Sequence, residues 1–502
     1  MTNVPLRAWR CLAALSLLAA ASAFAQPSLN VSDRAMLRQI LQAMPKGGDL
    51  HNHLSGSTYA ESYLQYAAND GICVDTVKLL ITPCATPQQI AANPASTASI
   101  VPASAVFAPY TSLYGDMLDS LSMRQFRPGL ESGHDHFFDT FGKFSAVSKT
   151  HVPEMLTQDV WRLASENVDY VETIFAPDFG RARELLKFVK PDQSFAEMRT
   201  AMMQSGHVPP IITASRAVID QAEGWMRNNL HCGTASAQPG CDSTVRYIYE
   251  LHRGVPLQQL FAEMVVGYEL ASADPRVVGL NPVMPEDSYI SMHDFDEQMR
   301  MFAFFHQLYP KIHLSTHAGE LWPGFVEPEG LRFHIRDSVM IANADRIGHG
   351  VDLTYEDDAA GLLKTMASRG VAVEVCLTSN DVILGVSGKA HPLRYYLAAG
   401  VPVALATDDP GVSRDDMTNQ YMRAVQEQGL DYATLKRLAR NSLEYSFAEG
   451  ESLWDGRDYS KMNSACSDAA SSTCKSFLAA NTKARIESRL EQRLRDFESA
   501  WK

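Results

Sequence analysis

The chain has 502 residues, of which 46% are hydrophobic and 20% are charged, an ordinary composition for a globular protein with a substantial core. This length allows one large domain or two domains of ordinary size. The formal net charge of −14 comes without a basic stripe, which argues against duplex nucleic acid and against an anionic membrane as partners.

Residues 1–25 have the pattern of a secretory signal peptide. Arg7 and Arg10 precede an apolar run from Cys11 to Ala21, and Ala23-Phe24-Ala25 places small residues where a signal peptidase reads them. The run is shorter than the roughly 20 apolar residues that a membrane span needs, so we expect cleavage after Ala25 and no anchor. Cleavage would change the formal charge from −14 to −16, because those two arginines are the only charged residues removed. A periplasmic or secreted protein is expected.

The next part of the chain predicts helices and one insertion before any regular alternation begins. A helix is expected at 31–44, followed by a short strand that ends in His51-Asn52-His53 and a loop containing glycine. Residues 71–133 are rich in Pro, Ala, Ser and Thr, which predicts an irregular surface insertion with one helical piece near 110–123. Two helices are then expected, at 137–147 and 152–167.

From residue 168 the sequence alternates between apolar runs of strand length and helical patterns. Strands are predicted at 168–175, 209–214, 277–282, 312–316, 346–350, 371–377 and 401–406. Helices are predicted at 180–204, 217–265, 294–308, 333–342, 355–369, 392–399, 417–428 and 432–446. With the first strand this makes eight strand–helix repeats, which favours an α/β fold of the closed (β/α)8 TIM-barrel type. Active groups are expected at the C-terminal strand ends.

The expected organisation is a single domain with additions. After the signal peptide, residues 26–450 form the barrel, with the insertion at 71–133, and residues 451–502 form a C-terminal extension. Residues 475–501 of this extension have the pattern of an amphipathic helix.

Cysteine placement agrees with export to an oxidising compartment. Six of the seven cysteines after residue 25 fall into close pairs within polar segments, which predicts local disulfides between them: Cys73 with Cys84, Cys232 with Cys241, and Cys466 with Cys474. Cys376 lies inside an apolar run and is expected to be a buried free thiol.

Potential metal ligands gather at three of the predicted strand ends. His51 and His53 have a spacing of two, which places both rings on one face of the first strand. His317 ends the fifth strand and Asp408 follows the eighth. Three histidines and a carboxylate suit one zinc ion with room for a water molecule, whose pKa the metal would lower toward ~7. A second metal is not expected, because residues 277–284 offer no bridging lysine.

Proton-transfer groups accompany these ligands. Glu320 follows His317 by three residues, His349 ends the sixth strand, and Asp409 follows Asp408. Each could also be a packed or turn residue, but their joint placement at the ends of barrel strands favours catalysis. His134-Asp135-His136 is interpreted as the start of a helix capped by Asp135. The following histidines are interpreted as structural: His293, His306, His313, His334 and His391.

Five ordered motifs of the chain resemble the adenosine deaminase family of the metal-dependent hydrolase superfamily. They lie at residues 44–57, 316–320, 346–350, 375–380 and 407–410, and residues 438–442 are also similar. The resemblance implies zinc-dependent hydrolytic deamination of a 6-aminopurine on a (β/α)8 barrel. It implies that the zinc ligands are His51, His53, His317 and Asp408.

The resemblance also implies roles for the other polar residues. Glu320 would protonate ring nitrogen N1, and His349 would orient and activate the hydroxide that adds to C6 before ammonia leaves. Asp409 would contact the water and the purine N7. Two substrate-binding positions depart from the family pattern: Ser55 stands where an aspartate usually meets the sugar 5′-hydroxyl, and Met284 stands where a glycine backbone usually meets N3.

Three hypotheses follow for function. The leading one is an exported deaminase that converts adenosine or 2′-deoxyadenosine to the inosine form, serving nucleoside salvage. Because Ser55 replaces the aspartate, a deaminase of adenine, an adenine nucleotide or another aminopurine is the alternative among enzymes. The alternative from another class is a secreted adenosine-binding or signalling protein with little turnover. The oligomeric state does not follow from the sequence.

Overall fold

The computed structural model describes residues 29, 32–109, 111–190 and 192–501. The signal peptide predicted at residues 1–25 lies outside this part of the chain.

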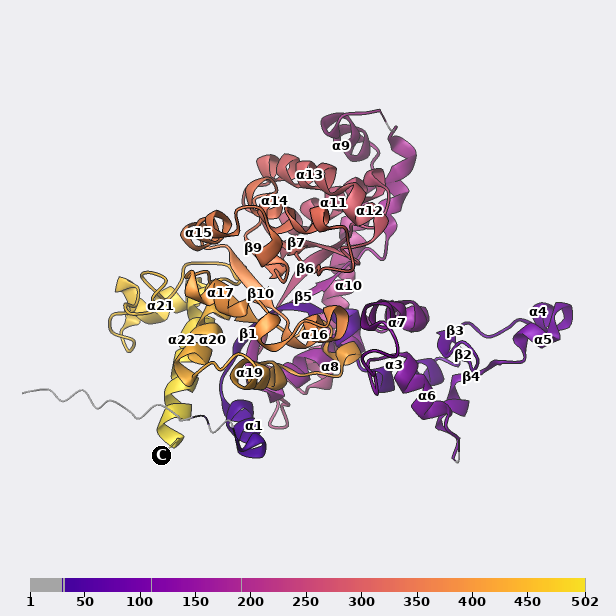
Figure 1. Ribbon diagram of the computed structural model, residues 1–502, viewed down its shortest axis with the longest axis horizontal. Helices are drawn as coiled ribbons and strands as arrows, with labels where there is room; N and C mark the ends of the chain where they lie inside the picture. Colours follow the sequence, from indigo (N-terminus) through magenta and orange to yellow (C-terminus); the bar gives the residue numbers. More distant parts are fainter. Residues whose placement is uncertain (1–28, 30–31, 110, 191, 502) are drawn as a thin grey trace, which may run out of the picture.

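Eight parallel strands form the barrel, and each pairs with the next strand of the series (Figure 1). They are β1 (Gly47–His53), β5 (Val168–Phe175), β6 (Thr244–His252), β7 (Val277–Val283), β8 (His313–Ala318), β9 (Arg346–His349), β10 (Ala372–Val375) and β11 (Val403–Leu405). The ring closes just beyond β11, where the N–H of His53 donates to the carbonyl of Asp408 at 3.0 Å and the N–H of Asp408 donates to the carbonyl of His51 at 2.8 Å. The predicted TIM barrel is confirmed.

The third strand is not where the sequence pattern placed it. Residues 209–214 belong to helix α10 (Val208–Asn229), and the strand is β6, inside the region predicted as helix. Pro209 and the β-branched residues after it mimic a strand, but proline is also favoured in the first helical turn, where no N–H is needed. In β6 Val245, Tyr247 and Leu251 occupy alternate buried positions, and the alternation with less buried residues is interrupted only at Ile248, which fits a largely buried strand.

Helices surround the strands and bury their apolar faces against them. The main ones are α8 (Val152–Ser165), α10, α11 (Leu257–Ala273), α13 (Phe295–Leu308), α14 (His334–Met340), α15 (Ala359–Arg369), α17 (Leu393–Ala398), α19 (Met417–Gln426) and α20 (Tyr432–Glu444). The core therefore lies mainly between the barrel and this helical layer. Near the N-terminus, α1 (Arg34–Ala43) packs against α19.

The insertion at 71–133 is more ordered than expected. It contains an antiparallel sheet of β2 (Cys73–Asp75), β3 (Leu80–Thr82) and β4 (Ile100–Pro102), and Figure 1 shows it extending away from the barrel. Two short helices, α4 (Pro87–Ala92) and α5 (Pro94–Thr97), lie at its tip and bury no residue. Strands of three residues are too short for their alternation to stand out in the sequence.

Helix α7 (Gly133–Ser148) follows the insertion and covers one side of the barrel mouth. Its N-cap is Ser132, whose hydroxyl accepts the N–H of Asp135 at 3.1 Å. A helix N-cap was expected here and is present, but the capping residue is Ser132 and not Asp135, which lies three residues later in the first turn. The α-helix places Phe137, Phe138 and Phe141 along the pocket described below.

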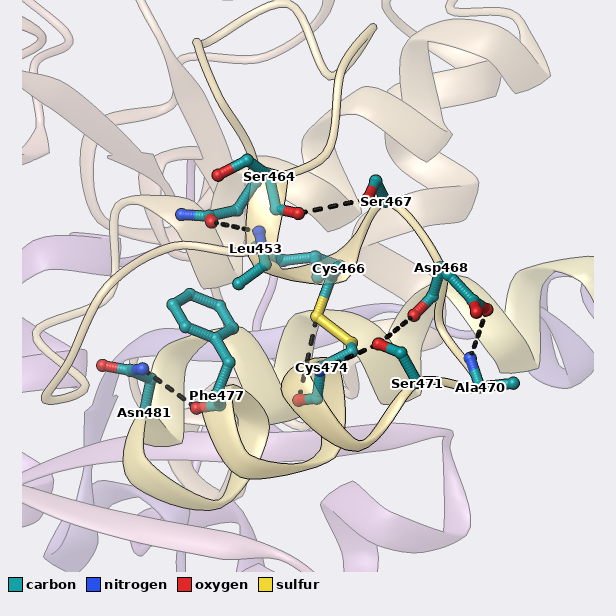
Figure 2. Close-up of a disulfide and its surroundings, with 12 residues drawn as sticks. Leu453, Ser464, Cys466, Ser467, Asp468, Ala470, Ser471, Cys474, Phe477 and Asn481 are labelled. Carbon is teal, nitrogen blue, oxygen red and sulfur yellow. Dashed lines mark hydrogen bonds between the residues drawn. A yellow bond between two sulfur atoms is a disulfide. The ribbon is translucent and has the colours of Figure 1, made fainter.

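The C-terminal extension ends in two helices, α21 (Ser472–Ala480) and α22 (Thr482–Ala500), where one was predicted. The chain leaves helical geometry at Asn481, whose side chain donates to the carbonyl of Phe477 at 2.9 Å (Figure 2). Helix α22 packs on α20 of the barrel, and α21 is fastened to the preceding loop by the Cys466–Cys474 disulfide.

All three predicted disulfides are present, and Cys376 is a buried free thiol. Each disulfide closes a short loop, with sequence separations of 11, 9 and 8 residues. None of the described helices has both the length and the apolarity that a membrane span requires.

Candidate active site and metal centre

The four predicted metal ligands converge at the C-terminal mouth of the barrel. Nε2 of His317 lies 3.1 Å from Nε2 of His51 and 3.3 Å from Nε2 of His53. Oδ1 of Asp408 lies 3.2 Å from Nε2 of His53 and 3.5 Å from Nε2 of His51. The ends of β1 and β8 and the bend after β11 therefore direct four ligand atoms, two of them from β1, at the same small volume.

This arrangement fits a divalent metal ion. Imidazole nitrogens at such short separations would direct lone pairs at one another, which is unfavourable unless a proton or a cation lies between them. Burial opposes charge on Asp408, but hydrogen bonds from His51 and His53 and nearby positive charge hold the pKa of this carboxyl well below its ordinary value. An anionic carboxylate beside three imidazoles is a donor set that suits zinc.

Buried acceptors behind two of the histidines fix how their rings are protonated. Nδ1 of His51 lies 2.6 Å from Oε2 of Glu374, and Nδ1 of His317 lies 2.5 Å from Oδ1 of Asn281. Since both acceptors receive a hydrogen bond from Nδ1–H, each ring carries its proton there and both Nε2 atoms keep a lone pair for a metal. Burial disfavours the charge of Glu374, but Arg346 and His51 outweigh it and lower the pKa of this carboxyl to about 2.

Glu320 is held by a buried charge network that the sequence analysis did not find. The carboxylate of Glu286 accepts the N–H groups of Gly319 and Glu320 at 3.1 and 2.7 Å. Nδ1 of His334 lies 2.6 Å from Glu286, and the Arg253 guanidinium lies 3.6 Å from it. Burial and the charges of Asp408 and Glu286 raise the pKa of Glu320 well above its ordinary value, which favours a carboxylic acid able to donate a proton.

A chain of hydrogen bonds determines the tautomer of His349. The N–H of Leu393 donates to Nδ1 of His391 at 3.1 Å, so the proton of neutral His391 is on Nε2, 3.1 Å from Oδ1 of Asn380. The Asn380 amide then donates to Nδ1 of His349 at 3.0 Å. Neutral His349 therefore carries its proton on Nε2, which makes no other hydrogen bond among the described residues. Burial lowers the pKa of both rings to about 3.

Three residues of the site have a backbone conformation that non-glycine residues rarely adopt. The φ angles of Met284, His349 and Asp408 are +85°, +68° and +62°. Met284 directly follows β7, His349 ends β9, and Asp408 lies three residues after the end of β11. Such strain costs of order 1–3 kcal/mol per residue and concentrates at functional sites.

Close backbone approach explains one glycine of the site. A Cβ at Gly348 would lie 2.6 Å from Cε1 of His51, so only glycine lets β9 pass behind this ring.

The site residues surround one pocket, which has a volume of about 310 Å³. Glu320, Asp408, Asp409, Ser55 and Met284 all line it, together with the phenylalanines of α7. Burial and the neighbouring Asp408 raise the pKa of Asp409 well above its ordinary value. The structure thus brings every predicted catalytic, substrate-binding and metal-binding residue to this pocket or its floor, where His349 and His51 are fully buried.

Two pocket residues were missed because their strand was predicted as helix. Glu250 and His252 lie near the C-terminal end of β6, two residues apart, and line the pocket. The signal was present in the sequence, because a spacing of two at a strand end is what drew attention to His51 and His53.

Three histidines that the sequence analysis did not assign to the site have supporting contacts near it. His334 and His391 are fully buried and support Glu286 and Asn380, respectively. His134 joins α7 to the loop after β7, with Nε2 3.0 Å from Oδ1 of Asp287.

Comparison with known proteins gives consistent results. The sequence model of the adenosine deaminase family matches residues 207–453. The adenosine deaminase of Shewanella loihica is 40% identical over 105 residues, which cover 21% of this chain and 31% of that protein. The chain thus spans about a third of the length of this curated relative, and an Escherichia coli adenosine deaminase aligns over 39% of its length.

Solved structures share the fold over most of the chain. An adenine deaminase from Arthrobacter aurescens superposes with a TM-score of 0.54 at 17% sequence identity, covering 90% of this chain and 99% of that one. An amidohydrolase from Burkholderia ambifaria, solved with bound zinc, gives a TM-score of 0.50 at 14% identity, covering 93% and 95% of the two chains. Together with the ordered motifs, the family match over residues 207–453 and the curated relatives support the assignment of this chain to the adenosine deaminase family in the metal-dependent hydrolase superfamily.

Proposed function

We propose that this protein is a zinc-dependent deaminase that hydrolyses adenosine or 2′-deoxyadenosine to the inosine form and releases ammonia. The observation that carries the proposal is the joint presence of a metal-binding set and three proton-transfer groups around one pocket of nucleoside size. A binding protein without turnover would need the pocket but not Glu320, His349 and Asp409.

Zinc bound by His51, His53, His317 and Asp408 would lower the pKa of a water molecule and so supply hydroxide at neutral pH. The neutral His349 ring donates from Nε2 and orients the attacking oxygen. Asp409, whose raised pKa favours the protonated form, accepts a hydrogen bond from the attacking oxygen and donates one to N7 of the purine. Glu320, held protonated by its surroundings, gives its proton to N1 of the purine as the oxygen adds to C6.

The test is an ultraviolet assay of the purified protein on adenosine, 2′-deoxyadenosine, adenine and AMP, with and without a chelator. Chelator-sensitive loss of adenosine supports the proposal, and zinc analysis identifies the metal. If adenine were the preferred substrate, the activity would match that named for the Arthrobacter neighbour, and Ser55 would be the first residue to explain it. If the zinc-loaded protein deaminated none of the four compounds, the proposal would be overturned.

We further propose that the protein works in the periplasm or outside the cell. Three local disulfides within surface segments are compatible with an oxidising compartment. Fractionation of producing cells, with mass spectrometry of the mature N-terminus, tests this location and the predicted cleavage after Ala25.

A further inference from the structure

Glu250 and His252 form a charged cluster on the pocket wall that none of the proposed catalytic roles uses. Both residues project from the C-terminal half of β6, and both line the same pocket as Glu320 and Asp409. The side chain of Glu250 is 24% exposed and that of His252 is 34% exposed, so both are accessible from the pocket.

His252 is held between two carboxylates. Its Nε2 lies 3.2 Å from Oε1 of Glu250, and its Nδ1 lies 3.2 Å from Oε2 of Glu263. Glu263 is fixed in turn, because it accepts the N–H of His252 at 2.8 Å and the Gln259 amide at 3.1 Å. Burial disfavours the imidazolium, but the two carboxylates outweigh it and raise the pKa of His252 to about 10. The ring is therefore a cation at neutral pH.

The single positive charge of His252 balances one of the two negative charges of Glu250 and Glu263, so one negative charge is left over. The cluster of Glu250, His252 and Glu263 is thus a net anion. Four carboxyl residues line the pocket, and its described lining includes no lysine or arginine. Besides His252 and His53, Lys149 also acts on Glu250 electrostatically, but it is an exposed residue at the end of α7 and does not line the pocket.

A carboxylate fixed by one oxygen has lone pairs left on the other, and these accept hydrogen bonds from hydroxyl groups. The same negative charge disfavours a phosphate group at short distance. A ligand placed with its purine toward Glu320 would extend its remaining part along the pocket wall, which includes Glu250.

We propose that Glu250, clamped by His252, accepts a hydrogen bond from a sugar hydroxyl of the substrate and selects neutral nucleosides over nucleotides. The inference rests on the proposed deaminase function and names the substrate class of that site. It also accounts for Ser55, because a second acceptor on the wall makes an aspartate at position 55 unnecessary for holding the sugar.

The test combines Glu250→Ala with substrates that each lack one hydroxyl: 2′-, 3′- and 5′-deoxyadenosine. In the unchanged protein, the substrate lacking the contacted hydroxyl should lose roughly tenfold to a hundredfold in kcat/KM relative to adenosine. In Glu250→Ala that same loss should shrink to within about threefold, while the other two deoxynucleosides keep their ratios. Equal losses in both proteins for all three substrates would overturn the hydroxyl contact.

Glu250→Gln tests the charge while keeping an acceptor. The ratio of AMP to adenosine turnover should rise roughly tenfold or more in this variant, and an unchanged ratio would overturn the selection against nucleotides. Glu449→Gln is the matched control, since Glu449 pairs with Arg246 near the other end of β6 and lies outside the pocket. Absence of deamination by the unchanged protein would instead refute the proposed function, so the two failures are distinguishable.

Discussion

Glu374 Oε2 lies 2.6 Å from Nδ1 of His51, and both side chains are fully buried beneath the metal-binding set. The carboxylate accepts a hydrogen bond from Nδ1–H, so the ring keeps its proton on Nδ1 and Nε2 of His51 faces the proposed zinc site as a lone-pair donor. Glu374 is itself held by Arg346 and by the Ser315 hydroxyl. This second layer therefore fixes one ring orientation before any metal binds.

Glu374→Gln should lower zinc affinity by roughly ten- to a hundredfold, since outer partners of metal-binding histidines typically have effects of this size. Competition with a chromogenic chelator measures the affinity. Glu172→Gln is the control, because Glu172 bonds the same Arg346 guanidinium at 2.5 Å and does not contact His51. Equal losses in the two variants would show that Glu374 acts only through the stability of the buried ion pairs.

Glu320→Gln should reduce kcat by roughly 10²- to 10⁴-fold, because an amide has no proton to give to N1. Zinc content and the melting temperature should stay close to those of the unchanged protein, since Glu286 binds the backbone N–H of residue 320 and not its side chain. An unchanged rate would remove Glu320 from the role of general acid.

The relay from His391 through Asn380 to His349 makes a separate prediction. Asn380→Leu removes the donor to Nδ1 of His349, so that ring can adopt the other tautomer and no longer present an N–H to the attacking oxygen. We expect kcat to fall by roughly ten- to a hundredfold with KM nearly unchanged, by analogy with other partners that fix a catalytic ring. His391→Gln, which keeps an N–H donor toward Asn380, should retain more activity than His391→Leu.

The accuracy of each strand predicted from the sequence depends on how long and how clearly bounded its apolar run is. Histidines two apart at the end of β1, and the motifs around His317, His349 and Asp408, lie on strands whose apolar runs are long or sharply bounded. The structure brings these residues together at the barrel mouth, as the strand-end pattern predicts. By contrast, β6 was missed because Pro209 and its β-branched neighbours imitate a strand, and Glu250 and His252 were lost with it. Local pattern alone did not distinguish the two segments.

The supporting layer was beyond sequence reasoning for a different reason. Glu374, Glu286 and Asn281 act through contacts between residues 33 or more positions apart. Nothing in a single sequence specifies such pairs, because they depend on which strands become neighbours around the barrel. The candidate metal ligands could be predicted from their positions at strand ends. The residues that hydrogen-bond to those ligands could be identified only from the three-dimensional structure.

The Cys466–Cys474 disulfide joins the loop before α21 to that helix, in a region whose side chains and backbone form several local hydrogen bonds (Figure 2). Replacing both cysteines by alanine should lower the free energy of unfolding by about 2 kcal/mol, as expected for closure of a loop of this length. Thermal unfolding monitored by circular dichroism measures the loss. Deaminase activity at 25 °C should be retained, because the bridge lies outside the pocket. Loss of activity without loss of stability would contradict this separation.

His134 makes a pH-dependent link across the pocket mouth, between α7 and the loop after β7. Burial disfavours the charged ring, but hydrogen bonds to Asp287 and Asp135 outweigh it and raise the pKa of His134 above its ordinary value of 6.5. A raised histidine pKa adds stability that is complete below pH 6.5 and is lost as the pH rises through the folded-state value. His134→Gln should therefore destabilise the protein at pH 6, by on the order of 1 kcal/mol, and have little effect at pH 9. His293→Gln is the control, since His293 is 64% exposed, forms an ion pair with its neighbour Asp294 and stacks on Tyr289 of the same short helix, so it links no separate elements. If His134→Gln cost the same free energy of unfolding at both pH values, the link would depend on packing against Phe138 and Phe325 and not on charge.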